Sequence, residues 1–224
     1  MLKKILSSRL LVLYIIPFTI GLLSTLSFQP FNLTIINFII FPIFFSLLVF
    51  INKKSRGTYR KKPYKKNFFI FGLLFGFGFY LSGVSWITNS LTFDETFKIL
   101  IPFALILIPL FLSLFLAFTI LIIGPYLQFN FLSLILFSGG IAFSDYLRSK
   151  LLTGFPWNLW AYSTAGFNEN LQVLNLIGLH SYNLITITFF TIPLIFFFKI
   201  TTIKKILCLI FSIIFFLSSF IYGN

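Results

Sequence analysis

The sequence has few acidic residues, histidines and cysteines. Its 224 residues include four Asp or Glu, one His and one Cys. A single thiol cannot form an internal disulfide, and a metal ion such as zinc needs several carboxylate, imidazole or thiolate ligands together. Gly76-x-Gly78 is not a nucleotide-binding fingerprint, because it is not part of a βαβ unit. We therefore expect neither a metal nor a cofactor.

Charge is also scarce, at 9% of residues, whereas 58% are hydrophobic and 35 are Phe. Soluble domains carry about 25% charged residues. A transmembrane helix needs about 20 mainly apolar residues, and long apolar runs recur along the chain. We expect an all-α integral membrane protein, one multi-pass domain over residues 1–224 with about seven transmembrane helices. These are expected near 10–28, 32–51, 68–90, 99–124, 129–147, 171–198 and 205–222.

The net charge of +13 could suggest nucleic-acid binding, but the placement of the charges argues against it. Eight of the seventeen Lys and Arg lie in NKKSRGTYRKKPYKKN (52–67), between two expected spans. With the N-terminus in the cytoplasm, fourteen cations fall on the cytoplasmic side and three outside. By the positive-inside rule we expect a basic cytoplasmic loop at 52–67, a cytoplasmic N-terminus and a periplasmic C-terminus. We expect no nucleic-acid partner.

The first apolar segment could be a signal peptide, since it follows a basic start. The run 10–28 is long for a signal core and lacks a clear small-x-small cleavage site. We expect it to be retained as the first helix. In the third segment, Gly72, Gly76 and Gly83 share one helix face, which predicts close helix packing.

The most informative stretch is SDYLRSKLLTGFPWNLWAYS (144–163), where charges and aromatics interrupt the apolar sequence. Residues 148–170 are expected to form a periplasmic interfacial loop, with Trp157 and Tyr162 at the membrane surface. Asp145 and Arg148 are three residues apart and share a helix face. They could form an ion pair that fixes the helix end, or they could contact a substrate.

The TGFPWN turn (153–158) combines a flexible Gly154 with a rigid Pro156 before Trp157. This pattern is typical either of a binding platform or of a turn that ends a helix. Trp86, at the outer end of the third segment, is expected on the same face. His180 is interpreted as a helix-start residue, and Cys208 lies inside an apolar run without a base nearby, so we expect no catalytic residue in this chain.

Four segments in this order resemble one family. They are STLSFQPFN (24–32), GLLFGFGFYLSGVSWITNSL (72–91), DYLRSKLLTGFPWNLWAYS (145–163) and LQVLNLIGLHSYNLI (171–185). Together they are similar to the N-terminal membrane half of apolipoprotein N-acyltransferase. The chain departs from the common pattern in having Asp145 where Glu is common and Tyr146 where Trp is common.

The resemblance implies a protein of the bacterial cytoplasmic (inner) membrane. The family moves an acyl chain from a phospholipid onto the N-terminal lipid-modified Cys of an apolipoprotein. The family's catalytic Glu, Lys and Cys belong to a nitrilase-like domain that follows the seventh helix, and none maps onto these 224 residues. We therefore expect a chain truncated before that domain and inactive alone, with a separately encoded nitrilase-like domain as one candidate partner.

The resemblance also suggests roles for the residues around 148–162. Arg148 is expected to contact a phosphate or carboxylate, and the Phe155–Pro156–Trp157 run to contact an acyl chain or the catalytic domain. The full candidate set is Trp86, Asp145, Arg148, Gly154, Phe155, Pro156, Trp157 and Tyr162. Two alternatives remain: a stand-alone phospholipid- or lipoprotein-binding scaffold, and a small transporter, which is disfavoured because no charge falls near the middle of a span.

Overall fold

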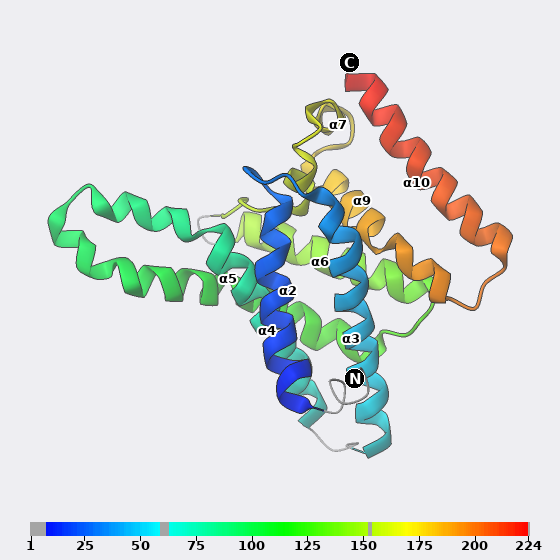
Figure 1. The fold of residues 1–224 in the computed structure, drawn as a ribbon, viewed down its shortest axis with the longest axis horizontal. Coiled ribbons are helices and arrows are strands. Elements are labelled where there is room, and N and C mark those ends of the chain that lie inside the picture. The colour runs from blue at the N-terminus through cyan, green and yellow to red at the C-terminus, as the bar shows by residue number, and fades with distance from the viewer. Residues whose placement is uncertain (1–7, 59–62, 152–153, 224) are drawn as a thin grey trace. The chain divides into compact units, whose positions relative to one another are not determined.

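The computed structural model describes residues 8–58, 63–151 and 154–223, and every regular element in these ranges is helical, as expected (Figure 1). The described chain forms two compact units. One comprises Met1–Thr25 with Ile51–Pro125, and the other Leu26–Phe50 with Tyr126–Asn224. The described residues leave out 1–7, 59–62, 152–153 and 224. Three sets of residues considered above therefore lie outside the description: Lys3 and Lys4, residues 59–62 of the expected basic loop, and Thr153 of the TGFPWN turn.

The first unit is built around helices whose backbones approach closely. Its elements are η1 (Leu11–Ile15), α2 (Ile16–Ser24), α4 (Pro63–Gly83), η4 (Ser85–Thr92), η5 (Glu95–Leu100), α5 (Ile101–Ile123) and η6 (Gly124–Tyr126). Gly72 and Gly76 of α4 lie against Ala117 and Ser113 of α5, as the predicted packing face requires. Small residues at such crossings let helices pack closely in lipid, where no hydrophobic force draws them together.

The second unit has an aromatic core. Its elements are η2 (Thr25–Ser27), η3 (Thr34–Ile36), the first part of α3 (Asn37–Thr58), α6 (Phe131–Lys150), η7 (Trp160–Thr164), α7 (Asn168–Leu171), α8 (Leu174–Ile177), α9 (Leu179–Thr191), η8 (Ile192–Phe197) and α10 (Thr202–Gly223). Phe41 contacts Trp160 edge to face with centroids 4.7 Å apart, and Phe137 meets Phe44 at 5.3 Å. Each such pair contributes about 0.5–1.5 kcal/mol beyond the area it buries.

Six helices in the described chain are long and apolar enough to cross a membrane. They are Thr34–Lys54, Lys65–Gly83, Glu95–Tyr126, Phe131–Lys150, Leu179–Phe197 and Thr202–Gly223. The remaining expected span, 10–28, corresponds to Leu11–Ser27, a shorter apolar helical run. The architecture is therefore that of a multi-pass, all-helical membrane protein.

Three expected boundaries differ from the structure. The span expected at 68–90 ends at Gly83, where α4 stops, and the residues that follow form η4. Helix α3 continues to Thr58 and α4 begins at Pro63, so much of the expected loop 52–67 is helical; Lys and Arg are good helix formers and can extend a helix into water. The expected span 171–198 is divided into α8, α9 and η8, and the candidate membrane span begins only at Leu179. Gly178, at φ +79°, separates α8 from α9 because a helix cannot continue through a left-handed residue.

Candidate functional site

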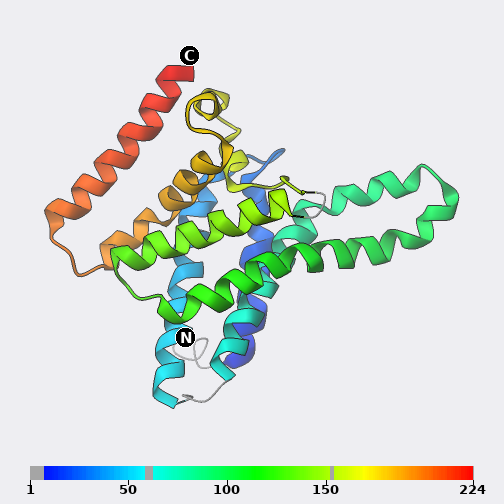
Figure 2. The same cartoon turned by 180° about the vertical axis from the view of Figure 1, so that it is seen from behind.

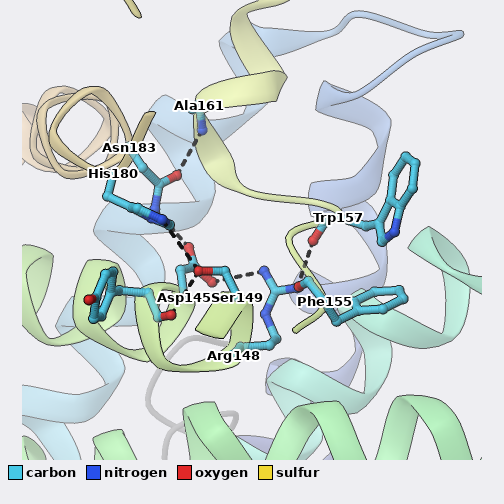
Figure 3. Close-up of polar contacts among 9 residues, drawn as sticks. Asp145, Arg148, Ser149, Phe155, Trp157, Ala161, His180 and Asn183 are labelled. Carbon is cyan, nitrogen blue, oxygen red and sulfur yellow. Dashed lines mark hydrogen bonds and ion pairs between the residues drawn. The ribbon is translucent and has the colours of Figure 1, made fainter. Parts of the chain in front are cut away.

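A buried ion pair occupies the last turn of α6. The Arg148 Nη2 atom lies 3.2 Å from Asp145 Oδ1, and the two side chains are 1% and 5% exposed (Figure 3). Their spacing of three residues places them on the same helix face, as the sequence predicted. A buried ion pair persists only if further hydrogen bonds satisfy its remaining polar atoms.

Arg148 makes two such hydrogen bonds to the turn that follows α6. Its Nη1 atom donates to the carbonyl oxygens of Phe155 and Trp157, each at 2.7 Å. The Phe155 amide in turn donates to the Arg148 carbonyl oxygen at 3.0 Å. The guanidinium therefore holds the backbone of the turn, while the Phe155 and Trp157 side chains point away from it (Figure 3). Trp157 is 54% exposed.

Asp145 connects the ion pair to α9 and η7. Its Oδ2 atom accepts a hydrogen bond from Asn183 Nδ2 at 2.9 Å, and Asn183 Oδ1 accepts one from the Ala161 amide at 2.9 Å. Asn183 is fully buried. One carboxylate thus joins α6, α9 and the start of η7, and its two oxygens have different partners.

The backbone of the turn uses two left-handed residues. Gly154 has φ +70° and Asn158 has φ +56°. The Gly154 amide donates to the Leu151 carbonyl oxygen at 2.9 Å. Between these residues, Pro156 restricts the chain and lies exposed beside Trp157. The turn is therefore determined both by its own conformational restrictions and by Arg148.

We predict that Gly154→Ala loosens this turn. An added Cβ would lie 2.7 Å from the Ser149 carbonyl oxygen, and left-handed backbone at a non-glycine residue costs about 1–3 kcal/mol. The rate of tryptic cleavage after Lys150 in detergent should rise. Gly178→Ala is the matched control, because Gly178 also has positive φ but its Cβ would meet no atom within 4 Å. Equal cleavage rates in Gly154→Ala and the unmodified protein would contradict the prediction.

Beside the ion pair, His180 contacts α6. Its Nε2 atom lies 3.3 Å from Ser149 Oγ, and its ring meets Tyr146 edge to face with centroids 5.0 Å apart. The Ser149 hydroxyl donates to the Tyr146 carbonyl oxygen at 2.8 Å. A base that activates a serine must accept the hydroxyl proton. Here the hydroxyl donates to the Tyr146 carbonyl oxygen, and its contact with His180 links α6 to α9.

The structure brings together most of the candidate residues. Asp145, Arg148 and the turn Gly154–Trp157 form one cluster in the second unit, and half-buried Tyr162 follows in η7. Trp86 belongs to η4 of the first unit. Arg148 was expected to contact a phosphate or a carboxylate, and in the structure it contacts the carboxylate of Asp145 in the same chain. Asn183 was missed, although an Asn inside an apolar segment was a usable signal.

Among the described residues, no group of three or more His, Cys, Asp or Glu could hold a metal ion.

The chain is similar to known proteins over the region that contains this cluster. Residues 20–192 match the family model for the apolipoprotein N-acyltransferase N-terminal domain. The curated relatives include proteins named apolipoprotein N-acyltransferase from Rhodopseudomonas palustris (32% identity over 77% of this chain and 31% of the relative), Brucella melitensis (30%, 79% and 33%) and Bradyrhizobium diazoefficiens (31%, 80% and 32%).

The matched region contains the whole cluster, from Asp145 to Asn183. The chain spans about a third of the length of these relatives. Since the family model covers more than half of its residues, the chain belongs to the apolipoprotein N-acyltransferase family, whose N-terminal membrane domain it carries.

Proposed function

We propose that this chain serves lipoprotein N-acyl transfer by binding lipid substrates at the membrane surface, with the Phe155–Pro156–Trp157 turn as the contact. One observation carries the proposal: a fully buried Arg148 holds the carbonyl oxygens on either side of Pro156, while Trp157 stays half exposed. A turn whose backbone is already held loses little conformational entropy on binding, and this turn presents an exposed aromatic ring. Such a ring at a helix end suits the amphipathic boundary between acyl chains and water.

In this proposal Arg148, Asp145 and Asn183 are positioning residues. Arg148 is buried and its donors are directed at Asp145 and the turn, so it acts on a substrate through the turn and does not contact a phosphate itself. Gly154 lies at the start of the segment that contains this turn, and Tyr162 lies at its end. Holding a substrate in one orientation lowers the entropic barrier to a reaction that follows.

The partners proposed from the family are a phospholipid acyl donor, an apolipoprotein and a nitrilase-like catalytic domain, in the bacterial cytoplasmic membrane. Within residues 1–224, the one cysteine, Cys208, lies in the candidate span Thr202–Gly223. A thioester-forming cysteine needs an electropositive and accessible site. We therefore propose that these residues bind substrate and do not themselves transfer the acyl chain.

The test uses the 224-residue chain in phosphatidylethanolamine vesicles with a fluorescent diacylated lipopeptide. We expect saturable lipopeptide binding and no acyl transfer. Trp157→Ala should weaken binding by about 2 kcal/mol, roughly 30-fold in Kd, if Trp157 is a central contact. Binding that is unchanged by Trp157→Ala would contradict the proposed contact. Acyl transfer by the chain alone would contradict the proposal that these residues bind substrate without transferring the acyl chain.

Tyr222→Ala is the matched control. Tyr222 is an aromatic residue of the second unit with the same exposed fraction as Trp157, 54%. A general loss of membrane anchoring should affect both variants equally. Binding that falls only in Trp157→Ala would support a specific contact at the turn.

A further inference from the structure

The first unit carries an arm, residues 84–100, that connects α4 to α5. It consists of η4 and η5 and extends away from α2, as both views show (Figures 1 and 2). Large apolar side chains are exposed along it, and Phe93 at the bend between η4 and η5 is 92% exposed. The other exposed apolar residues of the arm are Trp86, Phe97, Ile99 and Leu100.

The length of the adjoining helices places the arm near a membrane surface. Helix α5 has 23 residues and α4 has 21. At 1.5 Å per residue these helices are about 35 Å and 32 Å long, enough to cross a hydrocarbon core of about 30 Å. The arm begins where α4 ends, and its second half, η5, is the first part of the candidate span Glu95–Tyr126. The bend at Phe93 and Asp94 therefore lies just beyond the end of that span, where the chain leaves the hydrocarbon.

Helix η5 separates apolar from charged side chains. In a 3-10 helix, residues three apart lie directly above one another. Phe97 and Leu100 therefore share one side, and Glu95 and Lys98 share another, where they form an ion pair. Because η5 leads directly into α5, an apolar side next to a charged side suits the point where a membrane-spanning helix meets the lipid headgroups.

Three of the four hydroxyl groups of η4 are hydrogen-bonded within the arm. Thr88, Ser90 and Thr92 each donate to the carbonyl oxygen three residues earlier, at 2.7 Å. These bonds lower the cost of moving η4 into a medium poorer in water, because an unsatisfied hydroxyl is expensive there.

The bend keeps one group charged. Asp94 accepts hydrogen bonds from the Thr96 amide at 2.9 Å and from the Thr96 hydroxyl at 2.7 Å. These bonds lower the pKa of Asp94, so the carboxylate remains ionised at neutral pH. The carboxylate must stay in contact with water or headgroups, which limits how deeply the bend can enter the bilayer.

We propose that residues 84–100 anchor the first unit to the phospholipid surface, with Phe93, Phe97 and Leu100 inserted at the boundary between headgroups and acyl chains. Glu95 and Lys98 face water. This anchor does not depend on the proposed function, since it concerns the arm alone and would hold for the scaffold without any substrate.

The experiment places an environment-sensitive NBD label on single cysteines. In a Cys208→Ser background, which removes the one native cysteine, the label is attached at Phe97→Cys or, as the matched control, at Glu95→Cys. The labelled chain is reconstituted in vesicles of phosphatidylethanolamine and phosphatidylglycerol. NBD fluorescence is then quenched by iodide in the water, or by lipids brominated near the ester end of their acyl chains.

We expect the Phe97 label to emit at shorter wavelength, to be quenched by the brominated lipid and to be protected from iodide. The Glu95 label should show the reverse. Quenching of both labels by iodide would overturn the proposal and place the arm in water. Protection of both from iodide and from the lipid quencher would overturn it in favour of a protein partner. Leu100→Cys replaces Phe97→Cys if that variant is not monodisperse, since Leu100 shares its side of η5.

Discussion

Arg148→Met should lower the free energy of unfolding by about 3–5 kcal/mol, the usual cost of removing one partner from a buried ion pair. The substitution leaves the Asp145 carboxylate buried without its cation. It also removes the donor to the Phe155 and Trp157 carbonyl oxygens. Methionine roughly preserves the volume of the side chain, so the loss reports on charge and hydrogen bonding. Unfolding in mixed detergent micelles, followed by circular dichroism, measures the change.

The double variant Asp145→Leu/Arg148→Met separates the pair from the rest of the network. Removing both charges avoids an unpaired buried charge, so the double variant should be more stable than the sum of the two single losses predicts. It should not recover fully, because the turn still lacks its donor and Asn183 loses its acceptor. Strictly additive losses would contradict a coupled pair.

The exposed pair Glu95–Lys98 is the matched control, since it also joins residues three apart. Its side chains are 85% and 45% exposed, and such pairs contribute little because water screens them. Lys98→Met should therefore leave the unfolding curve almost unchanged. If Arg148→Met cost no more than Lys98→Met, the buried network would not stabilise the second unit.

How far the sequence predicted this site depends on the range of each interaction. The pairing of Asp145 with Arg148 follows from helix geometry, and the need for Gly154 follows from local backbone conformation, so both could be predicted from the sequence. The direction in which the Arg148 guanidinium points could not be predicted. Whether Arg148 points to solvent or back to the turn depends on where residues 155–157 lie, and the structure shows the latter.

Asn183 illustrates the longer range. It meets Asp145 across 38 positions in the chain, and its role depends on how α9 packs against α6. Apolar periodicity predicts that 171–198 is embedded in the membrane, but it does not predict which polar side chain faces a neighbour. Within that segment, Gly178 was a local sign of the break between α8 and α9. The aromatic core of the second unit was equally out of reach of the sequence. A high Phe content predicts that the rings are buried, but it does not predict which rings contact one another.

The crossing of α2 and α4 gives the second large prediction. A Cβ at Gly78 would lie 2.2 Å from the Phe18 carbonyl oxygen, and one at Gly21 would lie 2.1 Å from that of Phe75. The contacts are reciprocal and involve backbone atoms, which cannot rotate away as a side chain would. The two helices are also joined by a 2.9 Å hydrogen bond between the hydroxyls of Thr25 and Ser82.

Gly78→Ala must therefore push α2 and α4 apart. Overpacking in a dense interior typically costs about 1–3 kcal/mol and sometimes more. In lipid the loss is not offset, because the helices have no hydrophobic attraction and depend on close packing. Gly139→Ala is the control: Gly139 lies within α6 and its Cβ would meet no atom within 4 Å. That variant should gain up to about 1 kcal/mol from helix propensity. Opposite shifts in the unfolding midpoint would show that Gly78 is required for contact and not for flexibility, whereas equal shifts would contradict the close crossing.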